Sequence, residues 1–345
     1  MADRQGAHGA GNRHIVVIGA SAGGLQALER LLPGLPADLP ASVFVVLHLG
    51  ATSHLAYILG LRSPLPVREA ESGGMIEPGQ VYVAVPGQHL LIHDSHLLLR
   101  RGPRENFARP AIDPLFRSAA CSFGGAVIGV VLSGALNDGS AGLRAVKRCG
   151  GLAVVQCPED AAVASMPRSA IRIAAADHVA PAAELGPLIG RLVRQPAAPT
   201  PPIPVDIRLE TLIAAQELAG MKAEDALGKP SRFTCPECNG ALWEIEDGSL
   251  LRFRCHVGHA YTSETVLSAQ AEQAERMLWN LLRTHQERAA LAWRMAAKEE
   301  AEHRLEIARR LQERAREYEE DAELVRRLIR ERGATIDATG EQSGP

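Results

Sequence analysis

The chain offers a candidate nucleophile at Ser21, which lies in the G-x-S-x-G pattern formed with Gly19 and Gly23. An apolar run precedes this pattern, and a helical pattern starts at Leu25. A strand, a sharp turn and a helix in this order would expose the Ser21 hydroxyl at the C-terminal edge of a sheet, where it is presented for attack. The alternative interpretation is a tight turn without a chemical role.

Two further predicted strands end in the partners that such a serine needs. The strand at Val43–His48 ends in a histidine, and the strand at Val127–Ser133 leads into a loop that contains Asp138. A histidine takes the serine proton, and a carboxylate orients and stabilises that histidine. Because the C-terminal ends of parallel strands share one edge, we expect the three side chains to converge in an α/β fold with a doubly wound, mostly parallel sheet. Their order along the chain, Ser-His-Asp, differs from that of the α/β-hydrolases.

Two phosphate-binding interpretations of the glycine turn fit less well. A Walker A loop requires a lysine, and none follows Gly24. A dinucleotide fingerprint requires a glycine where this chain has Ser21, and an acid at the end of the next strand where it has His48.

Other residues compete for the roles of base and acid. The competing histidines are His54, His89, His93 and His96. His48 itself would also be explained as a strand-end residue, and Asp138 as a turn residue within Asn-Asp-Gly. Asp113 is the rival acid, but Asp113-Pro114 is typical of a helix N-cap followed by proline, which is a structural role.

Several short motifs follow one another along residues 14–193. They are Gly-Ala-Ser-Ala-Gly-Gly at 19–24, Leu-His at 47–48, Val-Tyr-Val-Ala at 81–84, His-Leu-Leu at 89–91, Arg-Pro-Ala-Ile-Asp at 109–113, Leu-Ser-Gly-Ala-Leu-Asn-Asp-Gly at 132–139 and Ala-Ser-Met-Pro at 164–167. In this order they resemble the catalytic domain of the chemotaxis receptor methylesterases, the CheB family. The family's serine, histidine and aspartate fall on Ser21, His48 and Asp138.

The resemblance implies hydrolysis of glutamyl methyl esters, and deamidation of glutamines, on the cytoplasmic helices of methylated chemoreceptors. It implies no cofactor for catalysis. Ser21 would attack the ester carbonyl with His48 as base, and the N–H groups of Ala22 and Gly23 would stabilise the oxyanion. A signalling scaffold built on an inert methylesterase-like domain is the alternative, and a hydrolase of an unrelated small ester is a third hypothesis.

The chain departs from the family at two positions and in one domain. Ala22 stands where the family commonly has threonine, and Ala135 where it commonly has methionine. Many family members also carry an N-terminal receiver domain. Since the first predicted strand begins near residue 14, we expect no receiver and no control by phosphorylation within this chain.

The composition is that of a cytoplasmic protein. The 345 residues carry a formal net charge of -3, which does not suggest a nucleic-acid binder. No apolar run reaches the ~20 residues that span a membrane. Residues 1–13 lack the apolar segment of a signal peptide, and we expect them to be disordered. Cys121, Cys149 and Cys157 are scattered and are interpreted as buried thiols rather than disulfides.

The remaining cysteines predict a metal site. Cys235 and Cys238 form one C-x2-C knuckle, a predicted hairpin follows, and Cys255 and His259 form a second knuckle. This pattern is zinc-ribbon-like and predicts a closed, structural Zn²⁺ site, because about 30 residues have too little core to fold alone. His256 is the alternative fourth ligand. Reduced thiols without metal are the other interpretation. Some receiver-less methylesterase relatives carry a similar segment.

Breaks in composition divide the chain into segments. The boundaries that we predict are a disordered 1–13, a catalytic domain at 14–193, a Pro-rich linker at 194–206, a helical connector at 207–232, a zinc-ribbon-like module at 233–261, long helices at 262–333 and a disordered tail at 334–345. Residues 263–332 contain no proline or glycine and repeat apolar residues at spacings of three and four. That pattern predicts a helical hairpin or a coiled coil, whose seam would pair within the chain, with a second copy of the chain or with a helical receptor.

Overall fold

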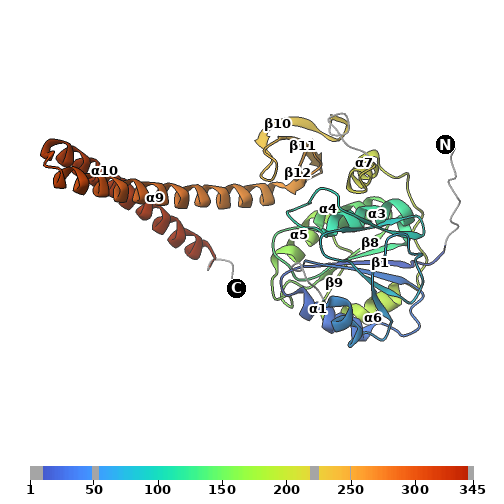
Figure 1. Cartoon of the computed structure of the whole chain (residues 1–345). Coiled ribbons are helices and arrows are strands. Elements are labelled where there is room, and N and C mark those ends of the chain that lie inside the picture. Colours follow the sequence, from blue (N-terminus) through green and yellow to red (C-terminus); the bar gives the residue numbers. More distant parts are fainter. Residues whose placement is uncertain (1–10, 49–53, 218–224, 249, 341–345) are drawn as a thin grey trace. The chain divides into compact units, whose positions relative to one another are not determined.

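A computed structural model of the chain describes residues 11–48, 54–217, 225–248 and 250–340. The chain divides after Val266 into two compact units. The first unit holds a large parallel sheet and a small antiparallel sheet, and the second consists of long helices (Figure 1).

A seven-stranded sheet in the order β3-β4-β2-β1-β7-β8-β9 is the centre of the first unit. Its strands are β1 (Ile15–Ala20), β2 (Ser42–Leu47), β3 (Val67–Glu69), β4 (Val81–Val83), β7 (Val127–Val131), β8 (Leu152–Gln156) and β9 (His178–Ala180). All neighbouring strands are parallel. β1 and β2 are buried along their whole length, which explains their continuous apolar sequences. The expected doubly wound parallel sheet is confirmed.

Helices cover both faces of this sheet (Figure 1). One face packs against α3 (Ile112–Phe123), α4 (Ser140–Arg148) and α5 (Ser165–Ala174), and the other against α1 (Gly24–Leu31) and α6 (Ala182–Leu192). The hairpin of β5 (His89–His93) and β6 (His96–Arg100) packs on α3. The remaining short elements are α2 (Leu55–Gly60) and the 3-10 turns Leu32–Gly34 and Gly124–Ala126.

The strand order places the end of β1 at the switch point of the sheet. β1 lies between β2 and β7, and the chain builds the sheet outward from it in both directions. Ligands of open α/β sheets bind at the carboxyl ends of the strands near such a point. Ala20 pairs with Leu47, and the N–H of His48 donates to the carbonyl of Ala20 at 3.1 Å. The residues that follow β1 and β2 are therefore neighbours.

The small sheet has four antiparallel strands in the order β10-β11-β12-β13. They are β10 (Lys229–Thr234), β11 (Ala241–Asp247), β12 (Leu250–Cys255) and β13 (Ala260–Thr262). Lys229 to Arg232 were expected in a helical connector but form the first part of β10. Pro230 is tolerated there because β10 is an edge strand, where a missing N–H breaks no ladder.

A buried ionic cluster joins the small sheet to the rest of the first unit. Its members are Glu105, Arg117, Glu210, Arg252 and Arg254, and all are buried. Glu105 accepts hydrogen bonds from Arg117 at 2.6 Å and Arg254 at 3.1 Å. Glu210 accepts from Arg252 at 2.7 Å and Arg254 at 2.8 Å. Burial alone would raise the pKa of Glu210, but the three arginines lower it below its ordinary value.

The segment before the small sheet is packed rather than a free spacer. The N–H of Gly125 donates to Thr200 at 3.0 Å, and the Arg13 guanidinium donates to the carbonyl of Pro196 at 2.7 Å. Helix α7 (Val205–Ala214) begins inside the range predicted as linker. Part of the predicted Pro-rich linker at 194–206 therefore contacts the end of the segment predicted as disordered at 1–13, and the N–H of Ala197 also donates to the carbonyl of Gly11 at 2.9 Å. Residues 1–10 lie outside the described residues.

The second unit is a pair of helices. α9 (Ser263–Ala301) begins in the first unit and continues into the second, and α10 (Leu305–Gly340) follows a short turn. Leu282 packs against Ala322 and Val325, and Trp293 donates to Glu319 at 2.8 Å, so the helices run antiparallel. The described helices include none with the length and apolar character that a membrane crossing requires.

The helices differ from the expectation at two places. α10 continues to Gly340 instead of ending at Gly333. One glycine inside a helix costs only about 1 kcal/mol relative to alanine, and here it does not stop the helix. Leu267 and Leu281, which belong to the apolar repeat predicted to form a helical seam in residues 263–332, are exposed, whereas Leu282 is buried.

Candidate active site

Ser21 lies at the turn between β1 and α1. Its N–H donates to the carbonyl of Ser133 at 2.9 Å, and its own carbonyl accepts from the N–H of Gly24 at 2.8 Å. Gly23 has φ 71°, a left-handed conformation that glycine adopts at little cost. A Cβ on Gly23 would lie 2.8 Å from the Ser133 hydroxyl and 2.6 Å from the Cβ of Ala162. This position therefore requires glycine for both backbone and space.

His48 joins Ser21 to Asp138. Its Nδ1 lies 3.2 Å from the Ser21 hydroxyl, and its Nε2 lies 2.9 Å from a carboxylate oxygen of Asp138. The ring is turned relative to chymotrypsin, where Nε2 faces the serine, but one nitrogen still faces each partner. The His48 side chain is 23% exposed and that of Asp138 only 4%. The structure therefore brings together the three residues that the sequence analysis selected.

Asp138 is surrounded by hydrogen-bond donors. Its carboxylate accepts from the backbone N–H groups of Ile112 at 2.7 Å, Asp113 at 3.3 Å and Gly139 at 3.0 Å. Ile112 and Asp113 open helix α3, whose N-terminus favours negative charge. Burial would raise the pKa of Asp138, but the hydrogen bond and charge of His48 and the N–H of Ile112 lower it to about 2. Asp138 is therefore an ionised acceptor at neutral pH.

The interpretation of Asp113 as a helix N-cap is wrong. The N-cap of α3 is Ala111, and Asp113 lies inside the first turn. Its carboxylate accepts from the N–H of Gly142 at 2.6 Å and so ties α3 to α4. Burial, followed by the nearby charge of Asp138, raises the pKa of Asp113 well above its ordinary value. The role of Asp113 is structural, as expected, but by a different contact.

The competing histidines lie elsewhere. His89 is buried and uses both ring nitrogens structurally, at 2.8 Å from the carbonyl of Pro103 and 3.2 Å from the N–H of Ala111. His93 and His96 pair at the exposed end of the β5–β6 hairpin. His54 is exposed at the start of α2.

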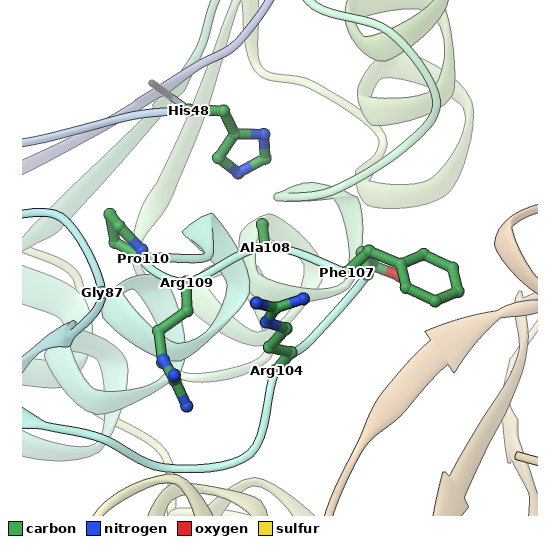
Figure 2. Close-up of a pocket in the computed structure, with 8 residues that line it drawn as sticks. His48, Gly87, Arg104, Phe107, Ala108, Arg109 and Pro110 are labelled. Carbon is green, nitrogen blue, oxygen red and sulfur yellow. The ribbon is translucent and has the colours of Figure 1, made fainter. Parts of the chain in front are cut away.

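A cavity of about 390 Å³ opens beside His48. The segment from Arg104 to Pro110 forms most of its wall. In Figure 2 the His48 ring and the Arg104 guanidinium point toward the space between them, whereas Arg109 extends away from His48. Arg109 donates to the carbonyl of Gly102 at 2.9 Å, and Arg104 lies 3.5 Å from Glu237.

Asn106, which also lines this cavity, was missed by the sequence analysis. Its side-chain amide donates to Asp138 at 3.1 Å. Asn106 lies in a loop whose sequence has no periodic pattern. The only sequence signal for a functional role is that it lies three residues before the Arg109-Pro110 motif. Asn137, next to Asp138, was likewise treated only as part of a turn.

Comparison with known proteins decides the family. Residues 16–189, about half of the chain, match the sequence profile of the CheB methylesterase family. The chain belongs to this family.

Relatives and a solved structure agree with the assignment. A protein of Leptospira interrogans, named "Putative protein-glutamate methylesterase/protein-glutamine glutaminase", is 42% identical over 184 residues, which are 52% of this chain and 95% of that protein. The "Protein-glutamate methylesterase/protein-glutamine glutaminase 2" of Anaeromyxobacter dehalogenans is 41% identical over 182 residues, 52% of this chain and 53% of that protein. The crystal structure of the Thermotoga maritima CheB methylesterase catalytic domain matches with a TM-score of 0.51 and 36% identity, over 54% of this chain and all of that domain.

Both departures from the common CheB pattern lie at the surface near Ser21. Ala22 and Ala135 are exposed. Ala135 follows Gly134, at which a Cβ would lie 2.9 Å from the Cβ of Ser21.

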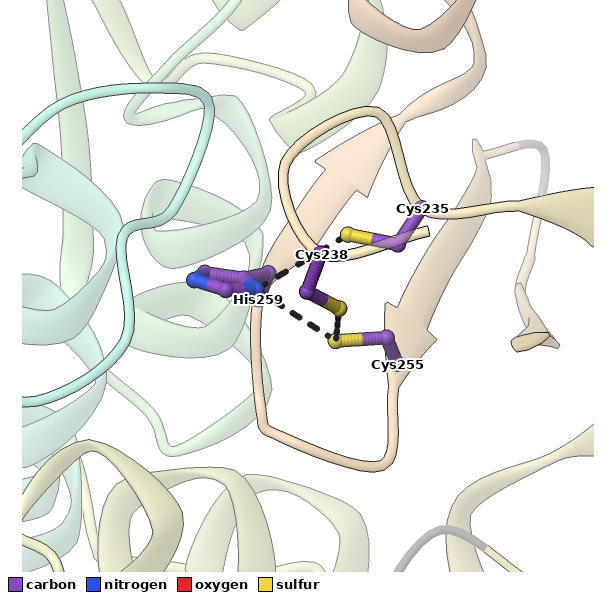
Figure 3. A group of neighbouring side chains, drawn as sticks. All are labelled: Cys235, Cys238, Cys255 and His259. Atoms are coloured by element: carbon purple, nitrogen blue, oxygen red, sulfur yellow. Dashed lines mark hydrogen bonds between the residues drawn. The ribbon is translucent and has the colours of Figure 1, made fainter. Parts of the chain in front are cut away.

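Outside the part of the chain that matches CheB proteins, a second side-chain cluster gathers Cys235, Cys238, Cys255 and His259 (Figure 3). The sulfurs of Cys238 and Cys255 lie 3.6 Å apart, and Nδ1 of His259 lies 3.5 Å from the sulfur of Cys255 and 3.7 Å from that of Cys235. Zn–S bonds of about 2.3 Å in a tetrahedron place ligand atoms roughly 3.5–3.8 Å apart. The donor set and its spacing therefore fit one tetrahedral zinc ion.

The surroundings of this cluster favour His259 over His256 as the fourth ligand. The second ring nitrogen of His259 lies 3.2 Å from Glu237, the carboxylate contact typical of metal-bound histidines. Cys235 also lies 3.3 Å from the Tyr261 hydroxyl. His256 is not among the four grouped ligand atoms.

Proposed function

We propose that this protein is a protein-glutamate methylesterase that hydrolyses glutamyl methyl esters on the cytoplasmic helices of methylated chemoreceptors. The observation that carries the proposal is the hydrogen-bonded line from Ser21 through His48 to the buried Asp138, beside a cavity, in a CheB-family chain. The names of the relatives support the substrate class.

In the first half of the reaction, Ser21 Oγ attacks the ester carbonyl and Nδ1 of His48 takes the serine proton. The carbonyl electrons move onto oxygen, and the resulting oxyanion lies near the N–H groups of Ala22 and Gly23 at the start of α1. Collapse of this intermediate breaks the C–OCH3 bond. His48 returns its proton to the departing oxygen, and methanol leaves.

In the second half, water attacks the acyl-serine while His48 takes a proton from it. Collapse of the second tetrahedral intermediate breaks the bond to Ser21 Oγ, which recovers its proton from His48. The product is a glutamate carboxylate. Attack on a glutamine amide follows the same steps with ammonia as the leaving group, so deamidation is included in the proposal.

Asp138 supports both halves of the reaction. Because its pKa is lowered to about 2, it stays ionised and stabilises the imidazolium that forms at His48. Arg104, which faces the same cavity, favours a substrate segment that carries carboxylates around the esterified glutamate.

The cysteine-histidine cluster is proposed as a structural zinc site. Four protein ligands close the coordination sphere, so the ion would hold the small sheet together and take no part in ester hydrolysis. We expect one Zn²⁺ per chain by elemental analysis in the purified protein and in His256→Ala. Cys255→Ser and His259→Ala should lose it, and Cys157→Ser should keep it. Zinc retained in His259→Ala but lost in His256→Ala would reverse the assignment of the fourth ligand.

The location and the assembly belong to the same proposal. An enzyme of receptor cytoplasmic helices acts in the cytoplasm, and α9 and α10 offer a surface through which the chain would self-associate. Sedimentation of the full chain over a range of concentrations tests that assembly.

The decisive test is methanol release from methyl-labelled chemoreceptor membranes. We expect release with the wild-type protein and none with Ser21→Ala. Ser72→Ala is a control substitution in the same unit, because the exposed Ser72 hydroxyl accepts from the N–H of Leu99 in β6 and not from a residue of the proposed triad. Equal release by wild type and Ser21→Ala would overturn the proposed nucleophile. No release by folded, zinc-loaded wild type would overturn the proposed activity.

A further inference from the structure

The catalytic carboxylate depends on a contact that comes from outside the parallel sheet. Asn106 donates one side-chain N–H to Asp138 at 3.1 Å and lies 3.3 Å from Asp113. Without the Asn106 amide, the buried carboxylate of Asp138 would lose a donor on the side that faces Asp113. The position of the Asn106 amide therefore matters for the charge that stabilises His48.

The other end of this amide is held by the junction of β13 and α9. The Asn106 carbonyl oxygen accepts from the backbone N–H of Thr262 at 3.2 Å. The Thr265 hydroxyl lies 3.3 Å from the same oxygen and 2.9 Å from the Thr262 hydroxyl, so its single proton is shared between these two acceptors. A backbone N–H can only donate, so it selects the oxygen of the amide. The nitrogen of Asn106 is consequently turned toward Asp138.

A second asparagine beside the carboxylate is held from the same junction. The carbonyl oxygen of Asn137 accepts from the Thr262 hydroxyl at 2.7 Å, and its nitrogen donates to Glu264 at 2.7 Å. Thr262 and Thr265 are 1% and 0% exposed, so these bonds do not compete with water. Both asparagines near Asp138 thus take their orientation from residues 262–265.

Backbone hydrogen bonds also join the segment at 104–106 to β13. The N–H of Asn106 donates to the carbonyl of Ala260 at 2.8 Å, and the N–H of Ala260 donates to Arg104 at 3.3 Å. The rings of Phe107 and Tyr261 are 5.1 Å apart. β13 therefore pairs with the segment that walls the cavity, and it begins immediately after His259.

We propose that the small sheet completes the active site. In this arrangement Asn106 is a positioning residue for Asp138, and Thr262 and Thr265 are the residues that position Asn106. The inference rests on the proposed esterase function and adds to it a requirement for residues 262–265, which lie outside the part of the chain that matches the CheB family.

Paired substitutions at Thr265 separate positioning from packing. Thr265→Val keeps the shape and loses the hydroxyl, whereas Thr265→Ser keeps the hydroxyl and loses the methyl group. We expect Val to lower kcat by about 10-fold with KM unchanged, which corresponds to about 1.4 kcal/mol, because a buried hydrogen bond to the Asn106 amide is lost. Ser should retain activity. Asn106→Ala should lower kcat further, by about 10- to 100-fold.

Thr211 provides a matched control. Its hydroxyl is bonded to the carbonyl of Ile207 within α7, in the same unit and without contact to either asparagine. Thr211→Val should leave kcat unchanged. If Thr265→Ser is impaired and Thr265→Val is not, the junction acts by packing and the proposal is wrong.

A second measurement does not depend on the substrate. The proton between Nε2 of His48 and Asp138 is expected to give a low-field ¹H NMR resonance, which Asp138→Asn should remove. We expect Thr265→Val to shift or broaden it and Thr265→Ser to preserve it. An unchanged resonance in Thr265→Val and Asn106→Ala would overturn the inference even if the wild type had no activity on chemoreceptor esters, whereas a changed resonance without activity would overturn only the proposed function.

Discussion

At the scale of single residues, the site depends on a few groups that have little freedom. Ser21 is fixed by the bond between its N–H and Ser133 and by the left-handed turn at Gly23. Asp138 is fixed by N–H donors from two helix starts and a loop. Such preorganisation means that small changes near these residues should alter the reaction more than the fold.

Asp138→Asn tests the electrostatic role of the carboxylate. The amide keeps the size of the side chain but cannot stabilise an imidazolium, so we expect kcat to fall by about 10³- to 10⁴-fold. Methanol release and near-UV circular dichroism should be measured together. A variant that keeps wild-type kcat would show that Asp138 is a structural residue.

Gly23→Ala tests the nucleophile turn. The added Cβ would meet Ser133 and Ala162 in a left-handed backbone, so we expect a loss of about 1–3 kcal/mol in the free energy of unfolding and a large loss of kcat. Gly73, with φ 85° and open space around its Cβ position, is the matched control. Gly73→Ala should show the backbone strain alone, about 1 kcal/mol by urea unfolding, without the loss of kcat.

At the scale of elements, the strand ends bring the proposed catalytic groups together and the α3 N-terminus stabilises the negative charge of Asp138. Helix α7 contributes Glu210 to the buried ionic cluster, where it pairs with Arg252 and Arg254 from β12. In the described chain the Nε atoms of Arg117, Arg252 and Arg254 have no hydrogen-bond partner. Loss of one carboxylate would leave more buried guanidinium groups unpaired and would lower the free energy of unfolding. The cluster also holds β12, and with it the adjacent strand β13, in place.

Glu210→Gln should destabilise the first unit by about 3–5 kcal/mol, because it leaves buried arginines without a partner. The lowered pKa of Glu210 means that its stabilisation is complete above its unfolded pKa, about 4.3, and is lost as pH falls toward the folded value. The free energy of unfolding in urea should therefore drop less between pH 5 and pH 3 in the variant than in the wild type.

An exposed ion pair provides the comparison for Glu210. Glu77 is 63% exposed and lies 2.9 Å from Arg68. Glu77→Gln should change the stability by less than about 1 kcal/mol. Equal effects of the two substitutions would contradict the role that we give to the buried cluster.

At the scale of the whole molecule, the family domain and the small sheet are one compact unit, while most of α9 and all of α10 form another. Cys255 and His259, two of the proposed zinc ligands, precede Thr262 by only a few positions in the chain. Loss of the proposed zinc ion should consequently change the position of Asn106 and its hydrogen bond to Asp138, although zinc takes no part in the proposed chemistry.

Zinc removal with a strong chelator should lower kcat by at least about 10-fold and shift the near-UV circular dichroism, because β13 loses its support. Added Zn²⁺ should restore both signals. Cys255→Ser should behave like the chelated protein, and Cys157→Ser like the untreated wild type. Full activity of a metal-free protein would show that the small sheet folds, and positions Asn106, without an ion.

The sequence by itself determined the parallel sheet, Ser21, His48 and Asp138, and the cysteine-histidine spacing. These features are local, since apolar runs make buried strands, and strand ends of a parallel sheet share an edge. The sequence did not determine Asn106, Asn137, the first-turn position of Asp113 or the buried partners of Glu210. Their roles depend on contacts between segments that are 29 to 156 residues apart in the chain, such as Asp113 with Gly142 and Asn106 with Thr262. Only the tertiary structure decides such contacts, because hydrogen bonds between irregular loops leave no periodic signal in the chain.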